Sequence, residues 1–440
     1  MDTLFHTQTA PADLLIANAE ILDPRTGVAG AHDVRIENGV IAELATPGAS
    51  PRSPKTAVID ATGKHLFPAF TDPHVHLRTP GQEYKENIAT GTAAAAAGGF
   101  CQLIAMPNTT PTVDSTSTLK ALIQTAREQA RVPTAFTASV TLGLKGETLS
   151  PMAALADSGA IAFTDDGKPI VNAGMFRKAL QYQKLTDRII ALHEEDPALS
   201  GAGAMHEGSV SARLGVTGIP SLSESLMVGR DSAMALDEDA RIHCQHISAR
   251  ESVEILEYFQ QKGAQVTAEA TPHHLILTHE DVATLDTTRK MNPPIRTEDD
   301  RQAVIEGLRS GVLSCIATDH APHAAYEKEM PFEQAPMGTT GIETSFSSVY
   351  TELVRPGVLT LELVIERMTS GCAIFGLPVP RIETGADANV VLIDLEKTWT
   401  VGENGYVSRS SNSCFHGRTF NGVVELTVAA GQVAFQKETA

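Results

Sequence analysis

One stretch of the chain reads Phe70-Thr71-Asp72-Pro73-His74-Val75-His76-Leu77-Arg78, and it indicates both a fold and a chemistry. Alternate side chains of an extended backbone share one face, so His74, His76 and Arg78 should point the same way. The preceding residues 65–70 are mostly apolar and include a proline, which is typical of a buried strand that runs out toward solvent. Two neutral histidines at such a strand end can bind one metal ion. In an isolated pair of this kind, one imidazole is more often packed in the core and the other exposed. The rest of the chain therefore has to show whether this pair binds a metal.

The bulk composition narrows the class of protein. With 440 residues, 42% of them hydrophobic, the chain can bury a large core. Its length suits about three domains, or one large α/β barrel with a small appendage. A net charge of −19 argues against nucleic acid or an anionic membrane surface as a partner. No apolar run is long enough to span a membrane, and residues 1–12 lack basic and apolar leader regions, so we expect a soluble, cytoplasmic protein.

The cysteines of the chain are scattered and include no Cys-x-x-Cys pair. An odd, dispersed set indicates neither a disulfide framework nor a thiolate zinc site. A metal in this protein would therefore have nitrogen and oxygen ligands. The five cysteines are Cys101, Cys244, Cys315, Cys372 and Cys414.

Both ends of the chain have the pattern of short strands and hairpins. Near the start, residues 34–41 contain Asn38-Gly39, a strong two-residue turn signal. Near the end, residues 389–394 and 422–428 are rich in β-branched side chains. We expect the two ends to fold together into one small β-sandwich domain. The predicted domains are residues 1–65 and 376–440 for the small β domain and residues 66–375 for the central domain.

The central part alternates short apolar runs with helical stretches, which is typical of βα units around a parallel sheet. Eight such strands predict an α/β fold of the TIM (β/α)8 barrel type, whose chemistry lies at the C-terminal strand ends. Two long loops, 196–220 and 321–341, suit a lid or a binding loop. The expected strands cover residues 66–76, 100–106, 135–140, 160–164, 188–193, 241–246, 265–270 and 312–319. The expected helices include 84–97, 115–131, 221–236, 249–262 and 298–310.

Ionisable side chains end several predicted strands, at the edge where a barrel would have its site. Each of them alone is more often structural, as a turn residue, a cap or a packed imidazole. Their joint position at strand ends is much harder to explain in that way, so together they predict one site. These residues are His74 and His76 on the first strand, Asp165 and Asp166 on the fourth, His193 on the fifth, His246 on the sixth and Asp319 on the eighth.

Four histidines and two carboxylates without a thiolate suit zinc or another borderline divalent ion. Six ligands exceed the need of one tetrahedral ion, and two ions roughly 3.5–4 Å apart would use them all. A bridging water between the ions would ionise near neutral pH and attack a carbonyl, while Asp319 takes its proton and returns it to the leaving nitrogen. In this arrangement His74, His76 and Asp319 bind one ion, His193 and His246 bind the other, and an aspartate of the fourth strand bridges both.

Five motifs identify a family. They are Asp72-Pro73-His74-Val75-His76-Leu77-Arg78, Met106-Pro107-Asn108-Thr109, Phe163-Thr164-Asp165-Asp166-Gly167, Met291-Asn292-Pro293-Pro294-Ile295-Arg296 and Ala317-Thr318-Asp319-His320-Ala321-Pro322-His323. Through them the chain resembles the amidohydrolase superfamily and, within it, the class I bacterial dihydroorotases, over nearly its whole length. The His-x-His pair and the late aspartate occur across the superfamily, whereas the Asn-Pro-Pro, Met-Pro-Asn and Asp-Asp-Gly elements are much narrower.

The resemblance implies a zinc-dependent dihydroorotase that interconverts N-carbamoyl-L-aspartate and L-dihydroorotate in pyrimidine biosynthesis. It implies two zinc ions (Zn2+) per subunit, bridged by Asp166 and a hydroxide, with Asp165 stabilising the turn. Lys168 is a weaker candidate for the bridge, because it lies beyond the strand end and would have to be carboxylated. His273 and His274 also fit the family pattern, and we assign them a supporting role rather than ligation.

The ring carboxylate of dihydroorotate requires a cation in the pocket. Arg78 is in phase with the two metal-binding histidines and could hold this carboxylate through both arms of its guanidinium. A surface ion pair is the plainer alternative for an arginine in so acidic a protein. By resemblance, the further substrate contacts are His76, Asn108, Asn292, His323, Met337 and Gly338, with Met337 standing where relatives frequently have phenylalanine.

Two alternatives stay open at this point. The chain could be another cyclic-amide hydrolase, such as a hydantoinase, dihydropyrimidinase or allantoinase, and those enzymes act on rings without the carboxylate. It could also be an inactive dihydroorotase-like partner subunit of aspartate carbamoyltransferase, although such subunits lose metal ligands that this chain retains. The sequence leaves open whether the protein forms a homo-oligomer or a complex with aspartate carbamoyltransferase.

Overall fold

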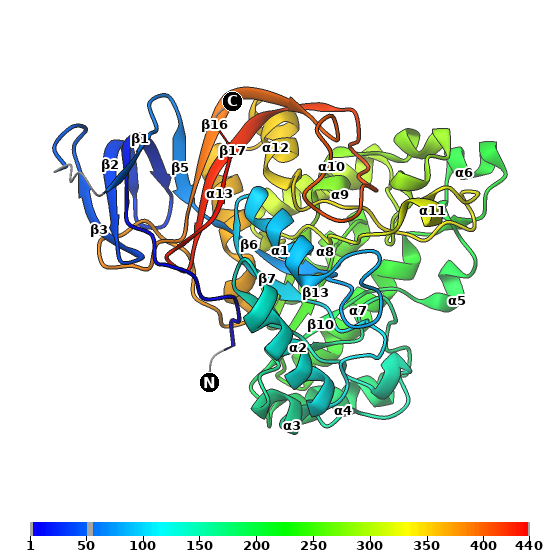
Figure 1. Cartoon of the computed structure of the whole chain (residues 1–440). Coiled ribbons are helices and arrows are strands. Elements are labelled where there is room, and N and C mark those ends of the chain that lie inside the picture. The colour runs from blue at the N-terminus through cyan, green and yellow to red at the C-terminus, as the bar shows by residue number, and fades with distance from the viewer. Residues whose placement is uncertain (1–2, 51–55, 439–440) are drawn as a thin grey trace.

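The computed structural model describes residues 3–50 and 56–438 (Figure 1). Within these residues, eight short parallel strands follow one another in a closed order. Two isolated bridges complete the order, Ala138 with Phe163 after β8 and Val75 with His320 after β15. The strands are β6 (Phe70–Val75), β7 (Phe100–Ala105), β8 (Thr134–Phe136), β9 (Ala162–Thr164), β10 (Ile189–Leu192), β13 (Ile242–Cys244), β14 (Val266–Ala270) and β15 (Cys315–Ile316).

One principal helix follows each strand of this ring and helps to cover it (Figure 1). These helices are α1 (Ile88–Ala97), α2 (Thr116–Gln129), α3 (Met152–Asp157), α4 (Ala173–Gln183), α7 (Leu222–Asp237), α8 (Arg250–Gln261), α10 (Glu298–Ser310) and α13 (Leu361–Thr369). Helix α10 begins after Thr297, which forms a capping box with Asp300, and ends at Gly311 with φ of 92°. The helix predicted over residues 298–310 is confirmed. It was predictable because the residues that start and end it are next to it in the sequence.

Shorter elements lie in the connections. The helices are α5 (Pro197–Ser200), α6 (Ser209–Leu214), α9 (Pro272–Ile276), α11 (Ala325–Lys328), α12 (Ser345–Val349) and α14 (Gly371–Ile374). Short 3-10 helices cover Leu142–Leu144, His279–Thr284 and Thr287–Arg289, and a π turn covers Tyr350–Val354. The strands β11 (Met205–His206) and β12 (Gly218–Ile219) pair with each other. The two segments predicted as long loops thus contain short elements of their own.

The two ends of the chain build a second sheet together, and their strands lie side by side in Figure 1. Asn38 and Gly39, with φ of 51° and 79°, form the tight turn between β2 and β3, as their sequence predicts. The strand order is β18-β17-β16-β5-β1-β2-β3, and β4 pairs with the first residues of β1 on the same edge as β5. The strands are β1 (Leu14–Asp23), β2 (Val28–Glu37), β3 (Val40–Ala45), β4 (Ala57–Asp60), β5 (His65–Pro68), β16 (Val390–Thr400), β17 (Thr419–Ala429) and β18 (Gln432–Gln436).

The strand expected over residues 66–76 is two strands. Its first half, β5, pairs with β1 and β16 in the terminal sheet, whereas its second half, β6, belongs to the ring. The backbone changes partner at Ala69, whose N–H donates to the carbonyl of Asn389 at 3.0 Å. The sequence pattern could not show this division, because nearly every residue of both halves is buried and neither half has the alternation of a strand with one exposed face.

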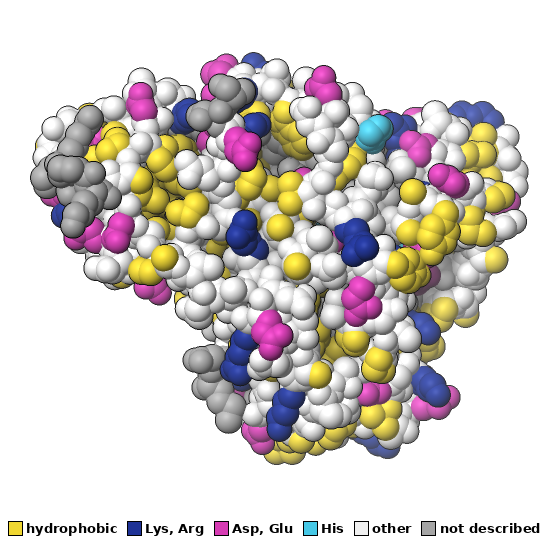
Figure 2. All heavy atoms as spheres, in the orientation of Figure 1, with side chains coloured by type: hydrophobic (Ala, Val, Ile, Leu, Met, Phe, Trp, Pro, Cys, Tyr) yellow, Lys and Arg dark blue, Asp and Glu magenta, His cyan; other side chains and the backbone are white. Residues whose placement is uncertain are grey.

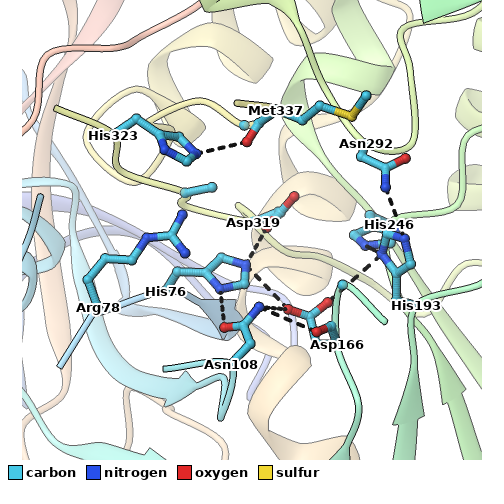
Figure 3. Close-up of a pocket in the computed structure, with 13 residues that line it drawn as sticks. His76, Arg78, Asn108, Asp166, His193, His246, Asn292, Asp319, His323 and Met337 are labelled. Atoms are coloured by element: carbon cyan, nitrogen blue, oxygen red, sulfur yellow. Dashed lines mark hydrogen bonds and ion pairs between the residues drawn. The ribbon is translucent and has the colours of Figure 1, made fainter. Parts of the chain in front are cut away.

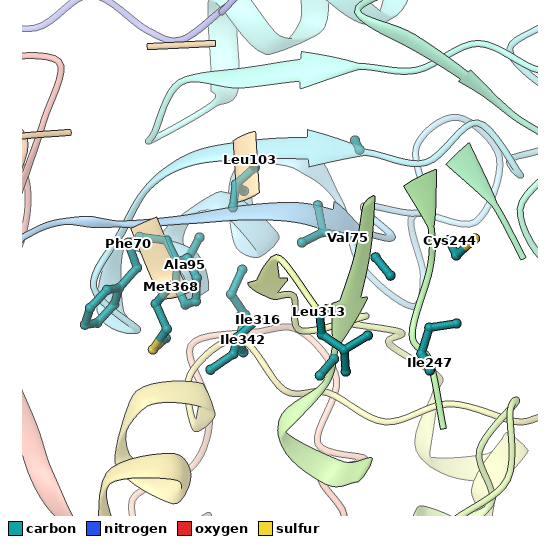
Figure 4. Close-up of a cluster of buried hydrophobic side chains, with 14 of the residues drawn as sticks. Phe70, Val75, Ala95, Leu103, Cys244, Ile247, Leu313, Ile316, Ile342 and Met368 are labelled. Carbon is teal, nitrogen blue, oxygen red and sulfur yellow. The ribbon is translucent and has the colours of Figure 1, made fainter. Parts of the chain in front are cut away.

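The main core lies between the ring and the helices around it. Figure 4 shows part of this cluster, in which Phe70 of β6 lies near Met368 of α13, with Val75 at the other end of the same strand. All residues of β6 and β7 are buried, as expected for parallel strands covered on both faces. A separate cluster, which includes Ile16, Ile36 and Leu392, fills the terminal sheet.

The surface carries mixed charges. On the face in Figure 2, lysine and arginine side chains stand singly among acidic and apolar ones, without gathering into a basic patch. Among the described residues, no helix combines the length and the apolar character that crossing a bilayer requires.

Candidate active site

The predicted site residues converge on one cavity of about 180 Å³ beyond the C-terminal ends of the ring strands (Figure 3). All of the predicted site residues line the cavity except His74 and Asp165, and Gly167 and Ala321 complete its wall. His74 is fully buried, and its ring centroid lies 5.3 Å from those of both His76 and His246. The parallel direction of the strands explains the convergence, because all their C-terminal ends meet at the same edge.

One group of ligand atoms contains His74, His76 and Asp319. Their atoms lie within 4.8 Å of one another. Oδ1 of Asp319 is 2.9 Å from Nε2 of His76 and 3.5 Å from Nε2 of His74. Burial alone would raise the pKa of Asp319, but His74 and His76 hold it well below its usual range. The group therefore offers two imidazole nitrogens and an ionised carboxylate to a cation.

A second group contains His74, Asp166 and His246, again within 4.8 Å. Nε2 of His246 lies 2.9 Å from Nδ1 of His193, so these two imidazoles face each other. Burial and the neighbouring His193 lower the pKa of His246 to about 4, which keeps this imidazole in the neutral form that binds metals.

Asp166 lies between the two groups, and Asp165 does not. Oδ1 of Asp166 is 3.7 Å from Nε2 of His74, and its Oδ2 is 3.5 Å from Nε2 of His76. Asp165 turns the other way, where its Oδ1 accepts the backbone N–H groups of Val140 and Thr141 at 2.8 and 3.0 Å. The two adjacent carboxylates thus have different surroundings, and only Asp166 is placed to serve both groups.

The donor set suits divalent cations. Nε2 of His74 is buried and has no hydrogen-bond partner among the described residues. An unpaired buried nitrogen is costly, and a metal ion is a partner that would satisfy it. The surrounding atoms are imidazole nitrogens and carboxylate oxygens, which zinc accepts.

Two glutamates that the sequence analysis missed support the histidines. Glu269 on β14 is fully buried; its Oε1 lies 2.6 Å from Nδ1 of His74 and its Oε2 lies 3.0 Å from Nε2 of His243. Oε2 of Glu195 lies 2.9 Å from Nε2 of His193. Two sequence features could have indicated these supporting roles. Glu269 is a carboxylate within a buried strand, and Glu195 lies two residues after His193.

Arg78 extends into the cavity from the loop after β6 (Figure 3). Its Nε donates to the carbonyl of Pro322 at 3.1 Å, which fixes the guanidinium while its other nitrogens remain available. Among the described residues it makes no ion pair with a carboxylate. Arg78 therefore does not form the surface ion pair that was its alternative role.

Both asparagines of the predicted site contact the ionisable cluster. Oδ1 of Asn108 lies 3.0 Å from Nδ1 of His76, and its Nδ2 donates to Oδ2 of Asp166 at 2.9 Å. Nδ2 of Asn292 donates to Oε2 of Glu195 at 2.8 Å. Both amides are held in place, so their orientation at the cavity wall is defined.

His323 and Met337 lie on the side of the cavity opposite the cluster (Figure 3), and Gly338, the next residue, also lines the cavity. Nε2 of His323 donates to the carbonyl of Met337 at 2.8 Å. Burial and the nearby Arg78 lower the pKa of His323 to about 2, so this imidazole is neutral. Gly338 has φ of +121°, and a Cβ there would lie 2.7 Å from that of Ala321, so only glycine fits.

Three of the site residues have left-handed backbone conformations. The φ values are 57° for Arg78, 34° for His246 and 46° for Asp319. Such conformations are unfavourable for residues with a side chain and persist where the surrounding structure enforces them. Their occurrence at one cavity is typical of a functional site.

Comparisons with known proteins agree with this geometry. A family model described as dihydro-orotase-like matches residues 63–252. A dihydroorotase of Pelotomaculum thermopropionicum is 41% identical over 424 residues, which are 96% of this chain and 98% of that protein. A dihydroorotase of Solibacter usitatus is 42% identical over 427 residues, 97% of this chain and 99% of the relative.

Solved structures show the same fold. The L-hydantoinase of Arthrobacter aurescens superposes with a TM-score of 0.85 at 23% identity, and the match covers 98% of this chain and 97% of that one. The dihydropyrimidinase of Brevibacillus agri superposes with a TM-score of 0.81 at 21% identity, covering 96% and 95%. At these identities the likeness concerns the fold alone.

Proposed function

This chain belongs to the dihydroorotase family, and from that premise we propose that it interconverts N-carbamoyl-L-aspartate and L-dihydroorotate in pyrimidine biosynthesis. The observation that carries the proposal is the position of Arg78 in the same cavity as the histidine and aspartate cluster. Dihydroorotate combines a cyclic amide with a carboxylate. The cluster suits hydrolysis of the amide, and the planar guanidinium suits the carboxylate.

The residues fit two divalent ions, and we assign zinc to both sites because the donors are imidazoles and carboxylates. When bound, such ions lower the pKa of water and polarise the carbonyl that is attacked. The ligands would be His74, His76 and Asp319 for one ion, His193 and His246 for the other, and Asp166 for both.

Asp319 moves the proton in this proposal. In the direction of ring opening, its carboxylate accepts a proton from the attacking water and delivers it to the ring nitrogen that leaves. The depressed pKa of Asp319 keeps the group ionised at neutral pH, ready to accept. Ring closure reverses these steps: Asp319 takes the proton from the ureido nitrogen as this nitrogen attacks the side-chain carboxylic acid, and returns it to the hydroxyl of that acid, which leaves as water.

The cavity wall orients the substrate. Arg78, anchored on Pro322, would hold the ring carboxylate, with Asn108 and His323 nearby. The backbone of Met337 and Gly338 would face the ring amide, because the missing side chain of Gly338 lets the main chain approach.

Several finer assignments accompany this proposal. We assign the chain to the class I bacterial dihydroorotases and its strand ring to the TIM (β/α)8 type, with the domain limits at residues 1–65, 66–375 and 376–440. A cytoplasmic location, a homo-oligomeric state and a complex with aspartate carbamoyltransferase stay predictions.

An assay of the purified protein tests the proposed function. Dihydroorotate, hydantoin and dihydrouracil are offered separately, before and after chelation and with zinc added back. We expect turnover of dihydroorotate that chelation abolishes and zinc restores. Turnover of hydantoin or dihydrouracil in preference to dihydroorotate would refute the proposal and favour another cyclic-amide hydrolase.

A further inference from the structure

Two lysines, Lys290 and Lys328, are buried beside the active site. They are 4% and 8% exposed. In the part of the chain that the structure describes, the ion pairs of lysines with carboxylates involve other residues. A buried ammonium without a carboxylate partner is unfavourable, so its presence calls for another source of stabilisation.

Backbone carbonyls supply that stabilisation. Nζ of Lys290 donates to the carbonyls of Glu333 and Ala335 at 3.0 and 2.8 Å. Nζ of Lys328 donates to the carbonyl of Pro336 at 2.7 Å. All three carbonyls belong to residues 331–338, the segment that ends in the cavity wall. Two lysine side chains thus hold one short segment by its main chain.

The same lysines tie this segment to its neighbours. Nζ of Lys328 also donates to the carbonyl of Thr287 at 2.9 Å, and Thr287 donates its hydroxyl to the carbonyl of Lys328. The carbonyl of Lys290 accepts the N–H of Gly338 at 2.7 Å. We call Lys290 and Lys328, with these contacts, the lysine clasp. It connects residues 287–290, residue 328 and residues 331–338.

The clasp borders the cavity on two sides without entering it. Met337 and Gly338 line the cavity directly after the carbonyls that the lysines hold. Asn292, another lining residue, follows Lys290 closely in the chain. Neither lysine lines the cavity itself, so an effect of either on the reaction would have to act through these neighbours.

We propose that Lys290 and Lys328 are positioning residues for the reaction, which hold the backbone of Met337 and Gly338 at the distance that the substrate ring requires. This inference rests on the proposed function for its kinetic part. The Nζ groups act by hydrogen bonds to carbonyls, and their protonated form makes stronger bonds than a neutral donor does. The clasp therefore fixes the backbone of Met337 and Gly338, which the flexible Gly338 would otherwise allow to move.

The first test is kinetic and uses the zinc-loaded full chain. Lys290→Met and Lys328→Met keep an unbranched side chain but remove the donors. We expect the KM for dihydroorotate to rise about tenfold, with kcat changed by less than about twofold, because the lost contacts orient bound substrate rather than the reacting groups. Lys328→Gln, which keeps a neutral donor, should fall between wild type and Lys328→Met. The zinc content of all variants should match that of the wild type.

Gln260→Met is the matched control. Gln260 on α8 also spans two carbonyls, those of Val266 and Val312 at 3.1 and 3.0 Å, and it lies outside the cavity. Its replacement removes a comparable pair of contacts, so a general loss of stability would affect this variant too. The KM of Gln260→Met should equal that of the wild type.

Hydrogen exchange tests the clasp independently of catalysis. Peptides that cover residues 331–338 should exchange faster in the lysine variants, while peptides of β14 keep their protection. An inactive wild type would refute the proposed function and leave this measurement valid. Unchanged exchange, or an unchanged KM in an active enzyme, would overturn the clasp. If a methionine variant fails to fold, the same two measurements on Lys290→Gln and Lys328→Gln decide.

Discussion

Oε1 of Glu269 lies 2.6 Å from Nδ1 of His74, and both side chains are fully buried. This contact orients the imidazole so that its Nε2 faces Asp166 and Asp319, where a bound cation would be its partner. Glu269 also contacts His243 and the backbone N–H of His246, so one carboxylate orients two of the proposed ligands.

Glu269→Gln should weaken metal binding. Glutamine keeps the size of the side chain but loses the charge that orients His74, so we expect zinc affinity to fall by about 10- to 100-fold. Competition with a chelator measures this affinity. The exposed Glu306→Gln on α10 is the control and should bind zinc like the wild type. Equal affinity of the two variants would contradict the role of Glu269.

Asp165→Asn and Asp166→Asn should behave differently although the residues are neighbours. Asp166→Asn should lose zinc and activity, because Asp166 lies between both ligand groups. Asp165→Asn should keep zinc and lose about 1 kcal/mol of stability, because an amide can still accept the N–H groups of Val140 and Thr141. Metal analysis and urea unfolding distinguish the two. A reversed pattern would mean that the bridge is misassigned.

Asp319→Ala should remove proton transfer. We expect kcat to fall by about 10²- to 10⁴-fold, the usual contribution of a general acid–base. Zinc content has to be measured in parallel, since Asp319 is also a proposed ligand. Normal turnover with zinc still bound would rule out its catalytic role.

Arg78→Ala should discriminate between substrates. Loss of a charged contact to the ring carboxylate should reduce kcat/KM for dihydroorotate by about 10- to 100-fold. Any residual turnover of dihydrouracil, which lacks the carboxylate, should be unaffected. A similar loss for both compounds would show that Arg78 only supports the local backbone through its contact with Pro322.

Lys328 should make stability depend on pH. Burial and the nearby Lys290 lower its pKa from 10.5 to about 7, with Cys414, Asp286 and Glu327 as the other ionisable groups that face it. Between these two pKa values the unfolded chain binds more protons than the folded one, so the free energy of unfolding should rise with pH. Lys328→Met lacks this contribution. Urea unfolding of both proteins below neutral pH and at about pH 9 should show the wild type gaining stability relative to the variant. A constant difference would contradict the lowered pKa.

The sequence could predict the parts of the site that depend on strand direction. His193 and His246 follow strands whose pattern is local, and parallel strands bring such ends together whatever the loops do. Helix α10 was predictable for the same reason, since its capping signals lie within the helix itself.

The supporting contacts could not be predicted because they join distant segments. Glu269 and His74 are 195 residues apart, and nothing near either residue indicates the other. The lysine clasp depends on carbonyl groups, which every residue has, so no sequence pattern could reveal it. The division between β5 and β6 depends likewise on a partner strand near the other end of the chain.

The division between β5 and β6 connects the ring to the terminal sheet through one continuous stretch of backbone. The strand that carries His74 enters the ring directly from β5, which is hydrogen-bonded to β16. In addition, the hydroxyl of Thr427 on β17 donates to the carbonyl of Ala96 at the end of α1, at 2.7 Å. The terminal sheet therefore supports the first ligand-bearing strand directly, and we expect that cutting the ring away from this sheet would destabilise the strand that carries His74.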